Sequence, residues 1–143
     1  MMTDHIATVE TDVAAPPERV WSALTDPAQV REYMFGAEVV TDWVVGGPIV
    51  WRGEYEGRAY EDKGQVVAYE PPQLLRVTHY SPLTGQPDVP ENYHTVTYRL
   101  EPSGDETHVV LTQDNNPSAA AAEHSRDNWS MMLRGLKEFV EAG

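Results

Sequence analysis

The sequence contains no cysteine, which excludes disulfide bonds, thiolate nucleophiles and cysteine-ligated zinc. It is also poor in positive charge, because 10 Lys and Arg residues face 23 Asp and Glu residues and give a formal net charge of −13 at pH 7. Phosphate binding requires clustered cations, so we expect no nucleic-acid partner and no attraction to an anionic membrane surface. The negative charge itself is typical of a solvated protein surface.

Long apolar runs are missing as well. No segment is long enough to span a bilayer, and the N-terminal residues lack the apolar core of a signal peptide. We therefore expect a cytoplasmic protein that does not insert into a membrane. Sequence signatures of catalysis are also absent: there is no Gly-x-Ser-x-Gly elbow, no phosphate-binding glycine-rich loop, no dinucleotide fingerprint and no His-Glu-x-x-His motif. The sequence therefore predicts no cofactor, no metal ion and no catalytic residue.

Apolar residues are plentiful enough for a real core. They make up 41% of the chain, which fits a single domain over residues 1–143. The alternating pattern of His5–Val13 predicts a first strand. Two short helices should follow, because Pro17 suits a first helical turn and the Asp26-Pro27 pair begins another helix, to about Tyr33. The apolar face of the first of these helices consists of Val20, Trp21 and Leu24.

Strands and turns dominate the middle of the chain. Short apolar segments alternate there with turn sequences rich in glycine and proline. Because most connections are short, neighbouring strands should pair as antiparallel hairpins, and six strands in a row should curl into a sheet with one concave face. The six predicted strands are Ala37–Thr41, Ile49–Tyr55, Arg58–Tyr69, Leu74–Tyr80, Tyr93–Leu100 and Thr107–Gln113.

The last quarter of the chain predicts one long amphipathic helix, which opens at Asn116-Pro117-Ser118 and runs to about Glu141. Its apolar face is bulky only in the C-terminal half, whereas the small residues Ala122 and Ser125 occupy the same face upstream. A helix that fills a concave sheet at one end and under-fills it at the other leaves a pocket, and Trp129 marks the boundary. The bulky residues are Trp129, Met132, Leu133, Leu136, Phe139 and Val140.

Three groups of residues form a pattern that extends over nearly the whole chain. The first is the segment 15–27, Ala-Pro-Pro-Glu-Arg-Val-Trp-Ser-Ala-Leu-Thr-Asp-Pro. The others are Gly64, Val66, Pro71-Pro72 and Leu74 in the middle, and Trp129, Leu133, Leu136, Lys137 and Phe139 near the C-terminus.

Together these residues resemble the START/Bet v 1-like helix-grip superfamily, most closely the branch named after the Hsp90 ATPase activator homologue. The resemblance implies an α+β helix-grip fold. In such a fold a curved antiparallel sheet of about seven strands wraps around a long C-terminal helix, and two short helices follow the first strand. Members include lipid and hormone binders, polyketide cyclases and co-chaperones, so the resemblance alone does not fix the function.

Pairing across the longer loop Ser81–Asn92 defines a testable register. If Tyr80 faces Tyr93, then His79 faces His94, and directly opposed residues share one face of the sheet. The further pairs are then Leu75–Tyr98, Val77–Val96, Val96–Gln113, Tyr98–Leu111 and Leu100–Val109. This face is apolar enough to be the inner face, and it ends in the polar residues His79, His94 and Gln113.

Charged side chains of the strands are expected on the outside. In this register Arg76 and Arg99 lie on the face opposite the apolar one and should be exposed. Four carboxylates fall in polar stretches that are typical of solvated strand edges or turns: Glu54, Glu56, Glu61 and Asp62.

The candidate site lies between the first half of the long helix and the hairpin of His79 and His94, with the Ser81–Asn92 loop as its lid. The two histidines have several interpretations: a polar anchor for a ligand, an acid/base pair, or solvated strand ends without a specific role. They could also bind a metal ion, although a third ligand of matched spacing is missing. Trp51 and Tyr55 share one strand face and would line the cavity or belong to the core. The expected lining is Trp51, Tyr55, His79, His94, Val96, Tyr98, Gln113, Ala122, Ser125 and Trp129.

Three functions are compatible with such a pocket. We favour non-catalytic binding of a small, largely apolar molecule by a monomer or homodimer. The second is an enzyme of the polyketide cyclase/dehydratase kind, in which His79, His94 and Tyr98 would transfer protons. The third, implied by the resemblance, is a co-chaperone module that interacts with Hsp90.

Overall fold

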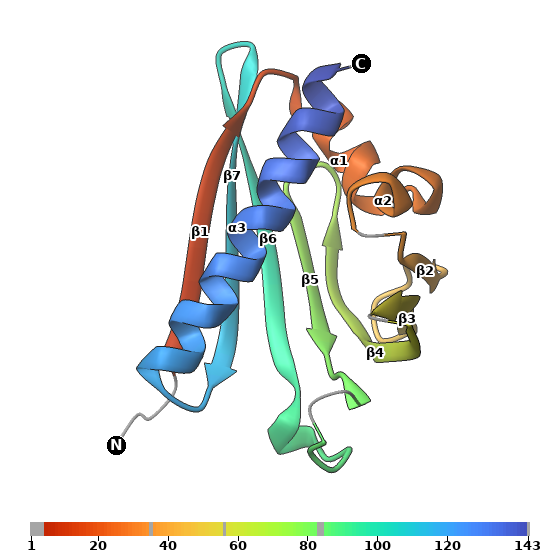
Figure 1. Ribbon diagram of the computed structural model, residues 1–143. Coiled ribbons are helices and arrows are strands. Elements are labelled where there is room, and N and C mark those ends of the chain that lie inside the picture. Colours follow the sequence, from red (N-terminus) through yellow and green to blue (C-terminus); the bar gives the residue numbers. More distant parts are fainter. Residues whose placement is uncertain (1–4, 35, 56, 83–84, 143) are drawn as a thin grey trace.

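The computed structural model describes residues 5–34, 36–55, 57–82 and 85–142. Its seven strands form one antiparallel sheet in the order β1-β7-β6-β5-β4-β3-β2, and the long helix α3 crosses one face of this sheet (Figure 1). In chain order the elements are β1 (His5–Val13), α1 (Pro17–Thr25), α2 (Pro27–Tyr33), β2 (Glu38–Thr41), β3 (Pro48–Tyr55), β4 (Arg58–Glu70), β5 (Leu74–His79), the 3₁₀ turn η2 (Pro90–Asn92), β6 (His94–Ser103), β7 (Glu106–Asn116) and α3 (Ala119–Ala142).

This architecture confirms the predicted fold class. The predicted register is confirmed as well, because His79 pairs with His94 and Val96 pairs with both Val77 and Gln113. The apolar residues of this face, from Leu75 to Leu111, are all buried. The main difference is that β6 and β7 are longer than predicted, since they are joined by a tight turn in which Gly104 adopts a positive φ of 62°.

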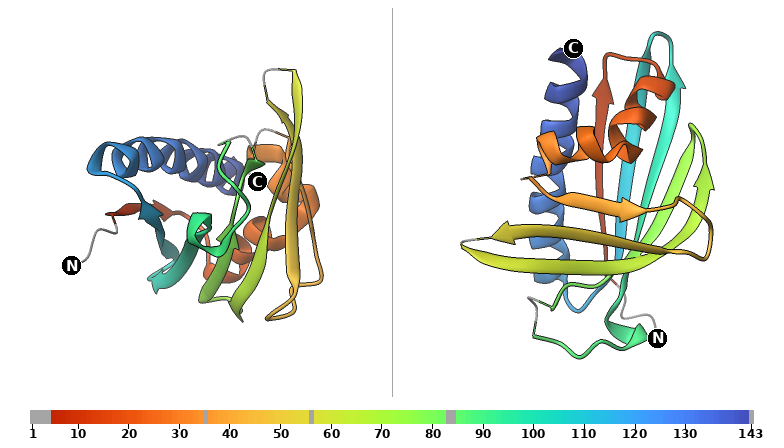
Figure 2. Two further views of the ribbon diagram at one scale, coloured as in Figure 1. Left: turned by 90° about the horizontal axis from the view of Figure 1, so that it is seen from below. Right: turned by 90° about the vertical axis from the view of Figure 1, so that its right-hand side faces the viewer.

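The sheet bends sharply along β4. Figure 2 shows β2, β3 and the first half of β4 turned away from the strands that carry α3. At the bend Gly64 lies so close to β5 that a Cβ atom there would be 1.8 Å from the carbonyl oxygen of Thr78. The close approach therefore requires glycine at this position.

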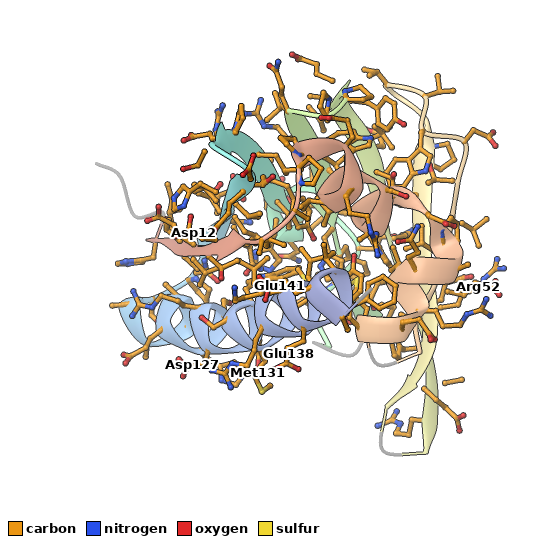
Figure 3. The ribbon with its side chains drawn as sticks, turned by 90° about the horizontal axis from the view of Figure 1, so that it is seen from above. Asp12, Arg52, Asp127, Met131, Glu138 and Glu141 are labelled. Atoms are coloured by element: carbon orange, nitrogen blue, oxygen red, sulfur yellow. The ribbon has the colours of Figure 1, made fainter. Side chains whose placement is uncertain are left out.

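Helix α3 buries its C-terminal half in the main core. Met132, Leu133, Leu136 and Val140 are buried, and Phe139 packs beside them. Residues on the opposite side, such as Asp127, Met131 and Glu138, point away from the sheet (Figure 3).

Polar contacts fasten the same end of α3 to the end of β1. Lys137 donates from Nζ to the backbone oxygen of Asp12 at 2.7 Å, and Glu141 accepts from the backbone amide of Ala14 at 2.8 Å. This end of the helix is therefore fixed by both apolar packing and hydrogen bonds.

Two predicted exposures differ from the structure. Arg99 is exposed as expected, whereas Arg76 is half-buried and donates from Nε to Thr97 Oγ1 at 3.0 Å. Asp62 was expected in solvent but lies on the inner face, where it contacts His79. Among the described helices, none is both long and apolar enough to cross a membrane.

Candidate functional site

A small cavity, here called the inner chamber, lies where the bent part of the sheet faces α3. Its volume is about 100 Å³. Most of its wall is aromatic or aliphatic, and Trp51 from β3, Tyr98 from β6 and Trp129 from α3 contribute large rings. The complete lining is Met34, Ala37, Trp51, Tyr60, Asp62, Val77, His79, Val96, Tyr98 and Trp129.

A second cavity of about 200 Å³, here called the outer groove, lies beside the inner chamber. His79 and Trp129 line both cavities, so these two side chains separate an apolar space from a polar one. The groove is formed by the start of α3, the end of β5 and the ends of β6 and β7 that meet there. Its lining is His79, Ser81, Asn92, His94, Gln113, Ser125, Asn128 and Trp129.

Asp62 and His79 form the polar pair of the inner chamber. An antiparallel bridge between Lys63 and Tyr80 brings their strands together, and His79 Nε2 lies 2.9 Å from Asp62 Oδ2. Both side chains are mostly buried, with 24% of His79 and 14% of Asp62 exposed. Trp51, which pairs with Asp62 across β3 and β4, meets the imidazole edge-on at 5.1 Å between ring centres.

The second atom of each group in this pair has no hydrogen-bond partner among the described residues. These atoms are His79 Nδ1 and Asp62 Oδ1, and both are shielded from solvent. Buried polar atoms of folded proteins nearly always have a partner, and the exceptions often lie at functional sites. The pair is therefore the most distinctive chemical feature of the cavity.

The walls of the outer groove are held by a different set of hydrogen bonds. His94 contacts the backbone oxygen of Asp114 through Nδ1 at 2.8 Å, which leaves Nε2 on the other side of the ring. Trp129 donates from Nε1 to Gln113 Oε1 at 2.6 Å. Ser125 donates to Asn116 Oδ1 at 2.9 Å. These hydrogen bonds fix the side chains that line the outer groove beside the first half of α3.

Burial changes the acidity of three tyrosines, of which Tyr60 and Tyr98 line the inner chamber. Burial alone raises the pKa of Tyr98 far above its usual range. The pKa of Tyr33, whose hydroxyl donates to the backbone oxygen of Ala23 at 2.7 Å, is raised mainly by burial too. The pKa of Tyr60 is raised by burial and, to a lesser extent, by the negative charge of Asp62. All three hydroxyls therefore stay protonated to a higher pH than the hydroxyl of a tyrosine in water.

The structure brings eight of the ten residues that the sequence indicated to the two cavities. Ala122 is half-buried on α3 but is not among the residues that line either cavity. The side chain of Tyr55 lies outside the described part of the structure. The eight are Trp51, Val96 and Tyr98 in the inner chamber, His94, Gln113 and Ser125 in the outer groove, and His79 and Trp129 in both.

Sequence reasoning missed Asp62, and a signal for it was available. Asp62 lies four residues before the buried Val66 on β4, and an even spacing on a strand places both side chains on the same face. Because charged residues flank Asp62 on both sides, the segment was interpreted as solvated. Met34, Ala37 and Tyr60 were missed because they enter the chamber from the end of α2, the following segment and the bent part of β4.

The predicted lid is described except for residues 83 and 84. Its base is held by polar contacts: the Tyr80 hydroxyl donates to the backbone oxygen of Gln86 at 2.5 Å, and Asp88 accepts from the Tyr93 hydroxyl at 2.6 Å and pairs with Lys63. Within the described ranges, no group of three or more His, Asp or Glu side chains is arranged to hold a metal ion.

A curved antiparallel sheet that holds one long helix, with a cavity between them, defines a helix-grip domain of the START/Bet v 1-like superfamily. The model of the family described as "Activator of Hsp90 ATPase homolog 1-like protein" matches residues 14–141. The chain belongs to this family.

Solved structures agree with this assignment. ChR145 from Cytophaga hutchinsonii is 50% identical, with a TM-score of 0.87, and the match covers 99% of this chain and 97% of that one. The Aha1 dimer from Colwellia psychrerythraea is 20% identical, with a TM-score of 0.75, and the match covers 96% of each chain. A protein from Arthrobacter aurescens is 17% identical, with a TM-score of 0.80, and the match covers 96% of this chain and 87% of that one. At these lower identities the likeness concerns the fold alone. A comparison with curated proteins finds no match.

Proposed function

We propose that this protein binds a small, largely apolar molecule between α3 and the sheet, with no reaction assumed. The observation that carries the proposal is the inner chamber, a partly enclosed space that is lined by rings and aliphatic side chains and adjoins a polar groove. Concave, mostly apolar cavities with a few polar groups are the usual form of small-molecule sites. The helix-grip fold of the family is in general a ligand-binding fold, which supports the same conclusion.

The sizes of the two cavities limit the ligand. An apolar cavity of about 150 Å³ holds benzene. The inner chamber of about 100 Å³ is smaller, so it suits a short chain, or one ring once its side chains move slightly apart. Any larger part must lie in the outer groove, among amide, hydroxyl and imidazole groups. We therefore propose a ligand with a flat apolar end for the chamber and an uncharged polar end for the groove.

Titration with toluene, followed by NMR, tests the proposal. Toluene is an apolar single ring, and it should shift the signals of Val77, Val96 and Trp129, which line the chamber. Val96→Phe should fill the chamber and abolish binding, whereas Val67→Phe on the exposed side of β4 should leave it unchanged. Ala37→Val provides a milder block with less risk to folding. Unchanged toluene binding in folded Val96→Phe and Ala37→Val proteins would contradict the proposal.

A role with Hsp90 is a second candidate, favoured by one observation: the family description names activation of that ATPase. An ATPase assay with the Hsp90 of the same organism would test it. Stimulation by this chain would support a co-chaperone function. An ATPase rate that stays at the level of Hsp90 alone would contradict a co-chaperone function.

A further inference from the structure

Two buried polar atoms of the Asp62–His79 pair, Asp62 Oδ1 and His79 Nδ1, have no hydrogen-bond partner among the described residues. Asp62 Oδ2 can only accept, so in the neutral imidazole Nε2 carries the hydrogen and donates a hydrogen bond to it at 2.9 Å, and Nδ1 then presents a lone pair. The second oxygen of Asp62 is also an acceptor. Neither atom has a partner among the described residues, and neither reaches bulk solvent. A molecule bound in the cavity could supply this donor once the side chains that cover the two atoms move slightly apart.

The arrangement makes His79 a strong acceptor. A carboxylate that accepts a hydrogen bond from one imidazole nitrogen fixes the tautomer and stabilises positive charge on the ring. The edge-on contact with Trp51 further restricts the orientation of the ring. Asp62 therefore acts as a positioning residue for the acceptor atom of His79.

The surroundings select the kind of donor. Lys and Arg are not among the residues that line the inner chamber, and its one carboxylate already contacts His79. An anionic ligand would be repelled by Asp62, and a cationic one would lose its water in a space that is mostly apolar. A neutral hydroxyl on a flat ring is neither repelled by Asp62 nor has a charge to desolvate, and the ring can pack against the aromatic walls of the chamber.

We propose that the Asp62–His79 pair anchors the hydroxyl of a phenol or a ring enol, which donates a hydrogen bond to His79 Nδ1 while its ring occupies the inner chamber. This inference rests on the proposed binding function and names the ligand class of the same site. The carboxylate behind the imidazole raises the basicity of Nδ1, and a more basic acceptor forms a stronger hydrogen bond with an acidic O–H.

A comparison of phenol with toluene separates the contribution of the hydrogen bond to His79 from that of the apolar cavity. The two compounds have nearly the same size and differ by a hydroxyl in place of a methyl group. We expect the wild-type protein to bind phenol more tightly than toluene by about tenfold or more. In His79→Phe this preference should disappear while toluene binding remains. In Asp62→Asn it should weaken, because the imidazole loses its carboxylate.

His108→Gln is the matched control, because His108 also contacts carboxylates, Asp12 and Glu10, but on the outer face of the sheet. This variant should retain the full preference for phenol. A direct readout in the wild-type protein is the ¹⁵N chemical shift of His79 Nδ1, which should move when phenol is added and stay constant with toluene. The ¹⁵N measurement keeps the test valid if His79→Phe does not fold.

The outcomes separate the two proposals. If toluene binds but phenol has no advantage, or if the advantage survives in His79→Phe, the anchor is wrong and the binding function stands. If neither compound binds, the binding function fails and the anchor fails with it. A phenol advantage that is lost in His79→Phe and kept in His108→Gln supports the anchor.

Discussion

The layer between α3 and the sheet differs greatly from one end to the other. At the C-terminal end of α3, Leu133 and Leu136 are fully buried against strands whose facing residues, such as Val109, are also fully buried. At the N-terminal end, Ser125 and Trp129 face two cavities, and side-chain hydrogen bonds replace apolar packing. One helix thus has a packed end and an open end.

The difference indicates how this fold combines stability with binding. A close-packed interior tolerates neither voids nor added volume, so a ligand site cannot lie in the same place as the core. Here β2, β3 and the first half of β4 turn away from the strands that carry α3, and the two cavities lie at the open end of the helix. Trp129 lies at the boundary, partly buried against the core and in contact with both cavities.

The largest effect is expected at the packed end. Leu136→Ala removes a side chain that is 0% exposed and should lower the free energy of unfolding by about 2–5 kcal/mol. Urea denaturation followed by circular dichroism measures this change. Met131→Ala, on the exposed side of the same helix, should stay within about 0.5 kcal/mol of the wild type. A loss of less than about 1 kcal/mol for Leu136→Ala would mean that this end is not packed.

A smaller effect is expected at the boundary. Trp129→Phe retains most of the ring but leaves the Gln113 carbonyl oxygen without its donor, so the unfolding free energy should fall by about 1–3 kcal/mol. Replacing both partners, in Trp129→Phe with Gln113→Leu, should cost less than the sum of the two single changes. Additive losses from the same denaturation experiment would show that the two side chains do not interact.

The smallest effect concerns the outer face, where His108 contacts Asp12 and Glu10 in solvent. Hydrogen bonds that the imidazole donates to Asp12 and, with a smaller effect, to Glu10 raise the pKa of His108 in the folded state. The pair therefore stabilises the fold fully below the unfolded pKa of about 6.5, and this stabilisation is lost as the pH rises through the folded pKa. His108→Gln should reduce stability at about pH 5.5 and have little effect at about pH 8.5. An equal loss of stability in His108→Gln at both pH values would exclude the positive charge of His108 as the cause of the loss.

The fold could be read from the sequence because its signals are local. Alternation and turn residues located the strands, and the Asp26-Pro27 start located α2 at Pro27–Tyr33, as the structure has it. The pairing of His79 with His94 followed from closing one loop, since a register shift by one residue would have turned the apolar face outward.

The site was less accessible to the same reasoning, because it depends on how elements are placed in space. Ala122 was expected at the cavity from its size and helical position. However, α3 packs mainly against β1, and Ala122, in the first turn of the helix, lies outside the walls of both cavities. Asp62 was hidden among charged neighbours, and only the contact between β4 and β5 near Gly64 brings it to His79. Such placements follow from the bend of the sheet, which no local pattern encodes.

The contrast between the two ends is tested most directly by adding the same methylene group to each. Val96 lines the inner chamber and Val109 lies in the packed core, and both point inward from neighbouring strands. Val→Ile keeps the strand propensity, so the two variants differ only in the space available. We predict that Val109→Ile lowers the unfolding free energy by about 1–3 kcal/mol, whereas Val96→Ile changes it by less than about 0.5 kcal/mol and weakens toluene binding. Equal losses at both positions, with toluene binding unaffected, would contradict the existence of an open end.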